Sequence, residues 1–171
     1  MPVLQWIHSG SLHIDWVLRI DTLTAVMLVV VTCVSSMVHV YSIGYMSHDK
    51  SRARFFSYLS LFTFMMLVLV TADNFVQLFF GWEGVGLASY LLIGFWFKKP
   101  SANAAAIKAF VVNRVGDFGL LLGMAAMYFT VGSREFDTVV AAAAALAEGQ
   151  VDLLGLTLPA LTTICLLLFM G

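Results

Sequence analysis

Residues 75–97 read FVQLFFGWEGVGLASYLLIGFWF, an apolar run interrupted by a single charged residue, Glu83. A membrane-spanning helix needs about 20 consecutive, predominantly apolar residues. We therefore predict that this stretch crosses a bilayer as a helix and carries a carboxylate inside the membrane. A charged group at that depth costs a few kcal/mol on insertion scales, so its presence requires an explanation.

Further runs on both sides of residues 75–97 have the composition of membrane spans. They cover residues 23–45, 55–71 and 103–131, and a fifth apolar run occupies residues 153–170. The chain is 61% hydrophobic and 11% charged, whereas soluble domains contain about 25% charged residues. These features predict an all-α polytopic membrane protein with about four full transmembrane helices and a partial fifth.

The connections between the predicted spans alternate in charge. Residues 46–54 and 98–101 are basic, whereas residues 73–74 and 132–152 are acidic. Because loops rich in Lys and Arg stay in the cytoplasm, we predict that both basic connections lie there and the acidic ones outside. The alanines at 141–147 favour a helix in the last connection, and we expect that connection to be interfacial.

The rest of the sequence narrows the possible functions. We expect residues 1–22 to be extramembrane or interfacial, without a secretory signal, because residues 1–18 hold no Lys or Arg. A net charge of −1 gives no reason to expect nucleic-acid binding. Cys33 and Cys165 lie alone in apolar runs, and no histidine set has ligand spacing, so we predict no metal site or disulfide. No motif for a redox cofactor is present.

Ionisable residues inside the predicted spans are the candidate functional residues. Glu83 belongs to the third span, and Lys108, Arg114 and Asp117 belong to the fourth. A rise of about 1.5 Å per residue puts Glu83, Arg114 and Asp117 at similar depth on antiparallel helices, with Lys108 nearer the cytoplasm, where it could snorkel. Arg114 and Asp117 are three residues apart, so they could form a fixed structural ion pair. A structural pair and a transport role are equally good interpretations of these two residues.

Glu83 and His39 are interpreted differently from that pair. Glu83 has no partner in its own span, so it either stays protonated or meets a cation from another helix, and both states suit a proton site. His39 lies inside the first predicted span, where a proton relay and a hydrogen-bonded structural role are both open. The glycines around Glu83 are best interpreted as positions of close helix packing.

Two long runs resemble a known family. Residues 80–95 (FGWEGVGLASYLLIGF) and 104–117 (AAAIKAFVVNRVGD) are similar to the antiporter-like subunit L, or chain 5, of respiratory complex I, the proton-pumping NADH–quinone oxidoreductase. Residues 21–24 and 51–56 resemble the upstream region of that family, and the likeness extends over roughly residues 20–131.

The resemblance implies roles for the charged residues and tells which part of the family's subunit this chain corresponds to. Glu83 would be the essential carboxylate of the ion channel, and Lys108, Arg114 and Asp117 would belong to its polar lining. Residues 23–71 would form two N-terminal transmembrane helices, and residues 75–171 the start of an antiporter-like, proton-translocating core. The chain is expected to be an N-terminal fragment that lacks the first one or two spans and ends shortly before a lysine partner for Glu83.

The resemblance also implies an activity with partners. The subunit would couple electron transfer from NADH to quinone with proton pumping, beside other membrane subunits of complex I in a lipid bilayer. NAD, FMN, iron–sulfur clusters and quinone would be held by partner subunits, in the cell membrane of a bacterium or the inner membrane of a mitochondrion. The alternatives are a subunit of a multi-subunit cation/proton antiporter and a membrane fragment whose charges are only structural.

Overall fold

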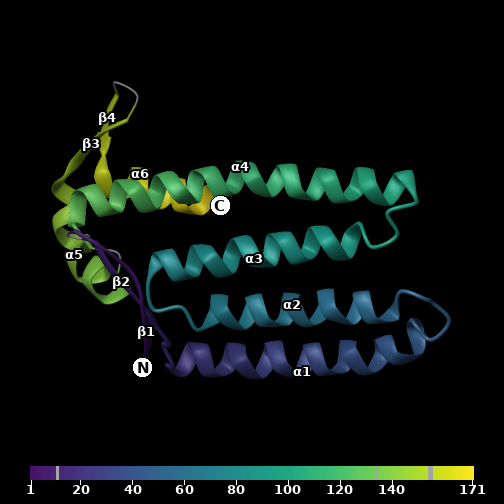
Figure 1. Ribbon diagram of the computed structural model, residues 1–171. Helices are drawn as coiled ribbons and strands as arrows, with labels where there is room; N and C mark the ends of the chain where they lie inside the picture. The colour runs from purple at the N-terminus through teal and green to yellow at the C-terminus, as the bar shows by residue number, and fades with distance from the viewer. Residues whose placement is uncertain (11, 134, 154–155) are drawn as a thin grey trace.

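Four long apolar helices form the body of the molecule and lie side by side in alternating directions (Figure 1). The structure is a computed structural model that describes residues 1–10, 12–133, 135–153 and 156–171. The four helices are α1 (Thr22–Tyr45), α2 (Arg52–Val70), α3 (Phe75–Ile93) and α4 (Pro100–Val131). Each is long and apolar enough to cross a membrane, as the sequence predicted.

Local chemistry sets the ends of these helices. The carboxylate of Asp21 accepts a hydrogen bond from the Thr24 N–H at 2.8 Å, and this bond caps α1. Asn74 caps α3 in the same way through the Gln77 N–H, at 2.8 Å. Pro100 opens α4, where its missing N–H costs nothing, and Gly132 ends it with a left-handed φ of 76°.

The third helix is shorter than the predicted span of residues 75–97. It ends at Ile93, and Gly94 takes the C-cap position, with its N–H donating to the carbonyls of Tyr90 and Leu92. Phe95 then turns back into the bundle, where it is 2% exposed and packs edge-on against Phe55. Phe95 therefore fills space at the end of the bundle instead of lengthening the helix.

Two short hairpins were not predicted from the sequence. Strands β1 (Pro2–Ser9) and β2 (Leu12–Val17) pair antiparallel within the N-terminal segment. Strands β3 (Gln150–Leu153) and β4 (Leu156–Pro159) form the second hairpin, ahead of helix α6 (Ala160–Met170). The fifth apolar run is thus helical only from Ala160, because Pro159 has no N–H for a helix interior and stands at the N-cap.

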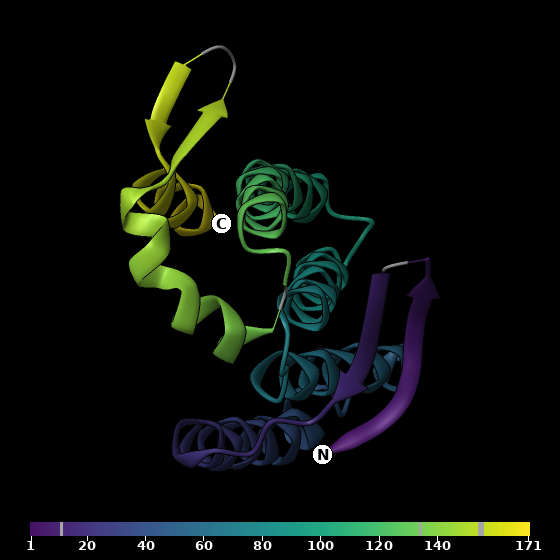
Figure 2. The same ribbon diagram turned by 90° about the vertical axis from the view of Figure 1, so that its left-hand side faces the viewer.

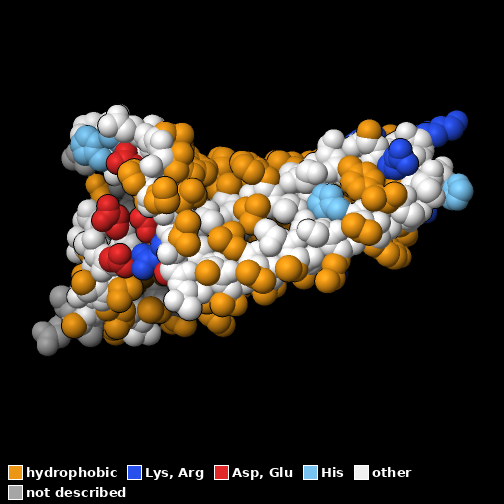
Figure 3. Space-filling model, turned by 90° about the horizontal axis from the view of Figure 1, so that it is seen from below, with side chains coloured by type: hydrophobic (Ala, Val, Ile, Leu, Met, Phe, Trp, Pro, Cys, Tyr) orange, Lys and Arg blue, Asp and Glu red, His pale blue; other side chains and the backbone are white. Residues whose placement is uncertain are grey.

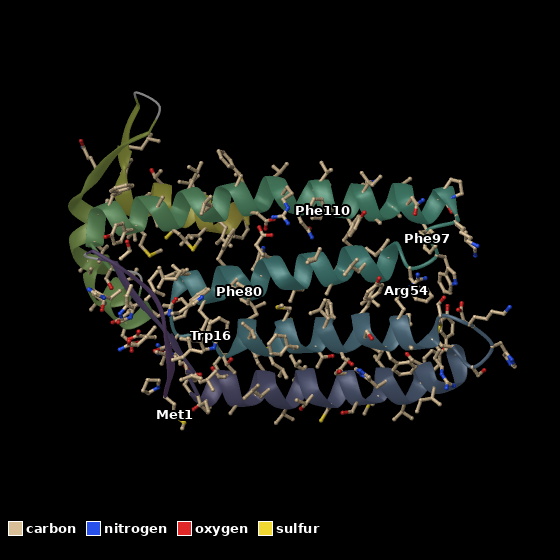
Figure 4. The ribbon with its side chains drawn as sticks, viewed as in Figure 1. Met1, Trp16, Arg54, Phe80, Phe97 and Phe110 are labelled. Carbon is tan, nitrogen blue, oxygen red and sulfur yellow. The ribbon has the colours of Figure 1, made fainter. Side chains whose placement is uncertain are left out.

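The N-terminal hairpin rests on the bundle through aromatic side chains. Trp6 and Trp16 pack edge-on, with ring centroids 5.0 Å apart, and both contact Phe80 of α3 at 5.6 and 5.5 Å. Figure 4 shows Trp16 and Phe80 next to one another at this end. The Gln77 side chain also accepts a hydrogen bond from the Val17 N–H at 3.2 Å. These contacts fix the hairpin at the ends of α2 and α3.

Helix α5 (Phe136–Glu148) occupies the acidic connection between α4 and α6. The helix expected from the alanines at 141–147 is therefore present, and its interfacial location stays a prediction. The side chains of Glu148 and Asp152, two acidic residues of this connection, lie outside the described part of the structure. Seen along the bundle in Figure 2, the four long helices follow one another in a row and α6 lies beside α4.

The two ends of the bundle differ in charge. In Figure 3 hydrophobic side chains run along the helices, acidic side chains gather at one end around a basic group, and further Lys and Arg side chains lie at the other end. The α1–α2 and α3–α4 connections share the basic end, as their sequences predicted (Figure 1). The assignment of this basic end to the cytoplasm stays a prediction from the charge rule.

Arg19 holds three segments together at the acidic end. Its guanidinium binds Asp21 at 3.1 Å, Asp137 of α5 at 3.0 Å and, more loosely, Asp73 at 3.5 Å. The hydrogen bonds that Arg19 donates to Asp137 and to Asp21 raise the pKa of Arg19 above its usual value. The hydrogen bonds from the Thr24 N–H and then Arg19 hold the pKa of Asp21 below its usual value. We call these four side chains the Arg19 clasp.

Acid is expected to open the Arg19 clasp. A carboxyl whose pKa is lowered in the folded state stabilises the fold above its unfolded pKa, and this contribution is lost as the pH falls through the folded value. For Asp21 that window lies below pH about 4, whereas the raised pKa of Arg19 matters only at strongly alkaline pH. Hydrogen-exchange protection of the first α1 amides, which Asp21 caps, should therefore fall below pH 4.

A pair of variants checks that expectation. Arg19→Gln should lower protection of the first α1 amides already at pH 7 and reduce its pH dependence, because Arg19 is one of the two groups that lower the pKa of Asp21. Asp49→Asn changes a carboxylate at the opposite end, where it accepts hydrogen bonds from the Ser51 N–H and Trp96, and should leave the start of α1 unaffected. Equal protection of the first α1 amides at pH 7 and pH 3 in the unmodified chain would contradict the clasp.

Candidate functional site

The structure brings three of the predicted intramembrane residues together between α3 and α4. Arg114 of α4 forms a direct ion pair with Glu83 of α3, and the same nitrogen, Nη1, lies 3.5 Å from Oδ2 of Asp117. One arginine thus stands between two carboxylates. With all three groups ionised, the trio carries an excess of one negative charge, which a single proton would neutralise.

Helix geometry explains this meeting. At about 1.5 Å per residue, Glu83 lies roughly 12 Å along α3 from the acidic end of the bundle. Arg114 and Asp117 lie one turn apart on the antiparallel α4, on one face of that helix. The similar depth predicted from the sequence is therefore matched by side-chain contact.

The indole of Trp82, next to Glu83 in the sequence, also belongs to the site. Trp82 donates a hydrogen bond from its indole Nε1 to Oδ1 of Asp117 at 3.1 Å. Asp117 therefore has separate partners on its two oxygens, Trp82 on one and Arg114 on the other. The position of Trp82 beside Glu83 in sequence was a usable signal, because indole N–H groups in apolar surroundings usually find an acceptor.

Burial differs strongly across the trio. The side chain of Asp117 is 9% exposed, that of Glu83 23%, and that of Arg114 42%. Arg114 also lies over the ring of Phe110, 4.5 Å from its centroid, and Phe110 is labelled on α4 in Figure 4. Asp117 is thus the fixed carboxylate of the site, whereas Arg114 is the more accessible group between the two acids.

A cavity of about 710 Å³ opens beside Asp117. Its lining includes polar groups of α3 and α4 next to the carboxylate, namely Trp82, Ser89, Asn113 and Asp117. Met170 and Gly171, from the end of α6, also line it. Hydroxyl, amide and carboxylate groups along one cavity are the chemistry that passes a proton from group to group, directly or through water.

The glycines around Glu83 pack closely against α2. A Cβ atom on Gly81 would lie 2.7 Å from the backbone N and Cα of Leu69, and one on Gly84 would collide with the side chain of Met65. The interpretation of the glycines around Glu83 as packing positions is confirmed for Gly81 and Gly84, whereas a Cβ on Gly86 would make only an ordinary contact, 3.7 Å from Asn113. By letting α2 and α3 approach, Gly81 and Gly84 fix the rotation of α3 that turns Glu83 toward α4.

The structure does not bring Lys108 and His39 to the trio. Lys108 is exposed and forms no ion pair among the described residues. His39 lies on α1, where Nδ1 is 2.8 Å from the Ser35 carbonyl and Nε2 is 3.4 Å from the Ser60 hydroxyl. Ser35 in turn bonds Thr63 at 2.7 Å. These hydroxyl partners were not predicted, since only packing places them beside His39.

Comparison with known proteins gives matches along most of the chain. The family model described as "NADH-Ubiquinone oxidoreductase (complex I), chain 5 N-terminus" matches residues 6–56. The model described as "NADH:quinone oxidoreductase/Mrp antiporter, TM" matches residues 72–171, which include the whole trio.

Individual curated proteins are similar over nearly the full chain. NADH-quinone oxidoreductase subunit L of Rhodobacter capsulatus is 57% identical over 99% of this chain and 25% of its own length. The subunit L of Rickettsia bellii is 54% identical over 100% and 27%. NADH-ubiquinone oxidoreductase chain 5 of Dictyostelium discoideum is 52% identical over 93% and 24%. The chain therefore spans about a quarter of the length of these relatives.

Proposed function

Because this chain belongs to the family of NADH–quinone oxidoreductase subunit L and chain 5, we propose that it carries a proton-translocating site built on Glu83. The observation that supports this most directly is the ion pair between Glu83 and an arginine that also faces Asp117. A carboxylate with one movable counter-charge at membrane depth is a group that can be made to take up and release a proton.

The site works as a switch between two pairings. With Arg114 on Glu83, the Glu83 carboxylate has its counter-charge. When Arg114 moves toward Asp117, Glu83 loses that counter-charge, and a proton can take its place. Arg114 needs only a side-chain movement for this exchange, because its Nη1 is already within 3.5 Å of Asp117. A second cation, from outside this chain, would shift the same balance.

Lys108 and His39 take secondary roles in this proposal. Lys108 lies on α4 about 9 Å closer to the basic end than Arg114, where it can exchange protons with that surface. His39 and its serine and threonine partners form a second polar group within the α1–α2 pair, and there they serve as a separate proton relay. Glu83, Arg114 and Asp117 carry the main path.

The energy for the switch would come from partner subunits. By analogy with the relatives, we propose a complex in which subunits holding NAD, FMN, iron–sulfur clusters and quinone carry out the electron transfer. This chain would sit among the other membrane subunits of that complex, in a bacterial cell membrane or a mitochondrial inner membrane. The match to the chain 5 N-terminus over residues 6–56 favours this assignment over a multi-subunit cation/proton antiporter.

The proposal is tested by proton flux in liposomes. The purified chain is reconstituted with a pH-sensitive dye inside, and a potassium–valinomycin potential drives protons across the membrane. We expect flux above that of empty liposomes and at least a fivefold fall with Glu83→Gln. Glu135→Gln is the matched control, since Glu135 lies outside the spans, and it should leave the flux unchanged. Absence of flux, or equal flux in both variants, would contradict the proposal.

Co-purification separates the two candidate assemblies. A tagged chain expressed in its own host should be recovered with flavin- and iron–sulfur-containing subunits if it belongs to the redox complex. Recovery with other membrane subunits alone, and with no flavin or iron in the sample, would instead favour the antiporter.

A further inference from the structure

A cavity of about 440 Å³ lies between α2, α3 and α4 at the basic end of the bundle, away from Glu83, Arg114 and Asp117. Figure 4 shows Arg54 and Phe97 at this end, opposite to Met1. The walls combine polar side chains with apolar ones. They include Arg54, Tyr58, Tyr90, Asn103, Leu91 and Ile107. A cavity of this size is within the usual range for small-molecule and cofactor sites.

Arg54 is the charged group of the cavity, and most of its hydrogen-bonding capacity is unused. A guanidinium has five N–H donors. Here Nη2 donates to the Phe95 carbonyl at 3.3 Å, and Nε is buried without a partner. Among the described residues no carboxylate pairs with Arg54. This differs from Arg19 and Arg114, each of which contacts carboxylates.

Neighbouring rings hold the Arg54 guanidinium in place. It lies over the ring of Phe95 at 4.9 Å and over that of Phe97 at 5.2 Å. Such stacking orients the plane of the guanidinium and leaves its edge available for hydrogen bonds. Arg54 is therefore a preorganised cation that lacks an anion.

The surroundings of the cavity are also positive. The α3–α4 connection carries Lys98 and Lys99, and the α1–α2 connection carries Lys50. Helices α2 and α4 both begin at this end, and neither has a side-chain hydrogen bond at its N-cap. Their first N–H groups add to the positive potential. An anion is the ligand that this arrangement favours.

We propose that this cavity binds the phosphate of an anionic phospholipid, with the headgroup on Arg54 and an acyl chain along Leu91 and Ile107. Arg54 lies in the first turn of α2, and so at the level where an apolar span meets the headgroup region. Basic pockets between transmembrane helices at the cytoplasmic side are known to suit anionic headgroups. Ile107 is 56% exposed and Phe97 55%, which offers an apolar surface for the chain of a lipid and not for free phosphate.

Native mass spectrometry of the delipidated chain in a neutral detergent tests this assignment. Phosphatidylglycerol, phosphatidylcholine and inorganic phosphate are titrated separately. The unmodified chain should bind phosphatidylglycerol about tenfold more tightly than phosphatidylcholine, and millimolar inorganic phosphate should not compete. Arg54→Gln should weaken phosphatidylglycerol binding about tenfold, as expected for the loss of a charge-assisted hydrogen-bonded pair. Arg52→Gln removes the same charge from an exposed position in the same turn that does not line the cavity, and it should change binding less than twofold.

Each remaining outcome has a defined meaning. Equal losses with Arg52→Gln and Arg54→Gln would overturn the site in favour of a diffuse basic surface. Competition by inorganic phosphate would overturn the lipid as its ligand. If Arg54→Gln does not fold, Ile107→Trp provides the second test, because it fills the cavity and leaves Arg54 in place. That variant should lose phosphatidylglycerol binding, and unchanged binding would contradict the proposal.

Discussion

Arg114→Gln is expected to destabilise the folded chain by about 3 kcal/mol, the low end of the cost of breaking a buried ion pair from one side. Glu83 and Asp117 would face each other without their shared cation, and the side chain of Asp117 is only 9% exposed. Arg114→Lys should recover part of the loss, because an ammonium restores the charge but not the two-sided geometry of the guanidinium. Unfolding in mixed micelles at pH 7, followed by tryptophan fluorescence, measures the change.

Two further variants isolate the ion pair. Lys108→Gln removes a cation from the same helix, but from an exposed position without an ion pair among the described residues, and should cost less than about 0.5 kcal/mol. The double variant Glu83→Gln/Arg114→Gln should lose less than the sum of its single changes, with a coupling of about 1 kcal/mol or more. Additive losses would mean that Glu83 and Arg114 do not interact in the folded chain.

Gly81→Ala is expected to cost about 2 kcal/mol and to disturb the ion site as well. The new methyl group would lie 2.7 Å from the backbone of Leu69, and a backbone, unlike a side-chain end, cannot move aside cheaply. Helices α2 and α3 would have to separate or rotate. Since Glu83 is two residues further along α3, its pairing with Arg114 should weaken, and proton flux in liposomes should fall together with stability.

Two other glycines of the same helix are the controls for that prediction. Gly86→Ala places its Cβ 3.7 Å from the nearest side-chain atom, an ordinary contact, so the gain in helix propensity of up to about 1 kcal/mol should appear. Gly84→Ala meets the flexible side chain of Met65 and should fall between the other two. Equal effects at all three positions would mean that the approach of α2 to Gly81 does not occur in the membrane.

The membrane spans and the family were predicted from the sequence. A helix satisfies its backbone hydrogen bonds within one segment, so an apolar run long enough to cross a bilayer specifies its own structure. The predicted span 103–131 therefore became Pro100–Val131, and the predicted span 23–45 became Thr22–Tyr45. The motifs at residues 80–95 and 104–117 likewise identified the family, which is confirmed by the matched models and relatives.

The hairpins and the clasp at the acidic end were not predicted. Strand pairing joins residues through register, as between Pro2 and Val17, and the Arg19 clasp joins residues 118 positions apart in sequence. The sequence of a single segment does not reveal which strand a hairpin strand pairs with or which carboxylates Arg19 contacts, because these partners lie on other elements.

For Glu83, Arg114 and Asp117, the sequence determined one property and the tertiary structure another. The sequence placed Glu83, Arg114 and Asp117 at one depth, since depth follows from counting residues along a helix. Only the packed structure decided that Arg114 binds Glu83 while Trp82 holds Asp117, because these contacts depend on how each helix is rotated about its axis. An apolar span is hydrophobic on every face, so its sequence carries little information about that rotation. The rotation is set by contacts such as Gly81 against Leu69, where two backbones approach.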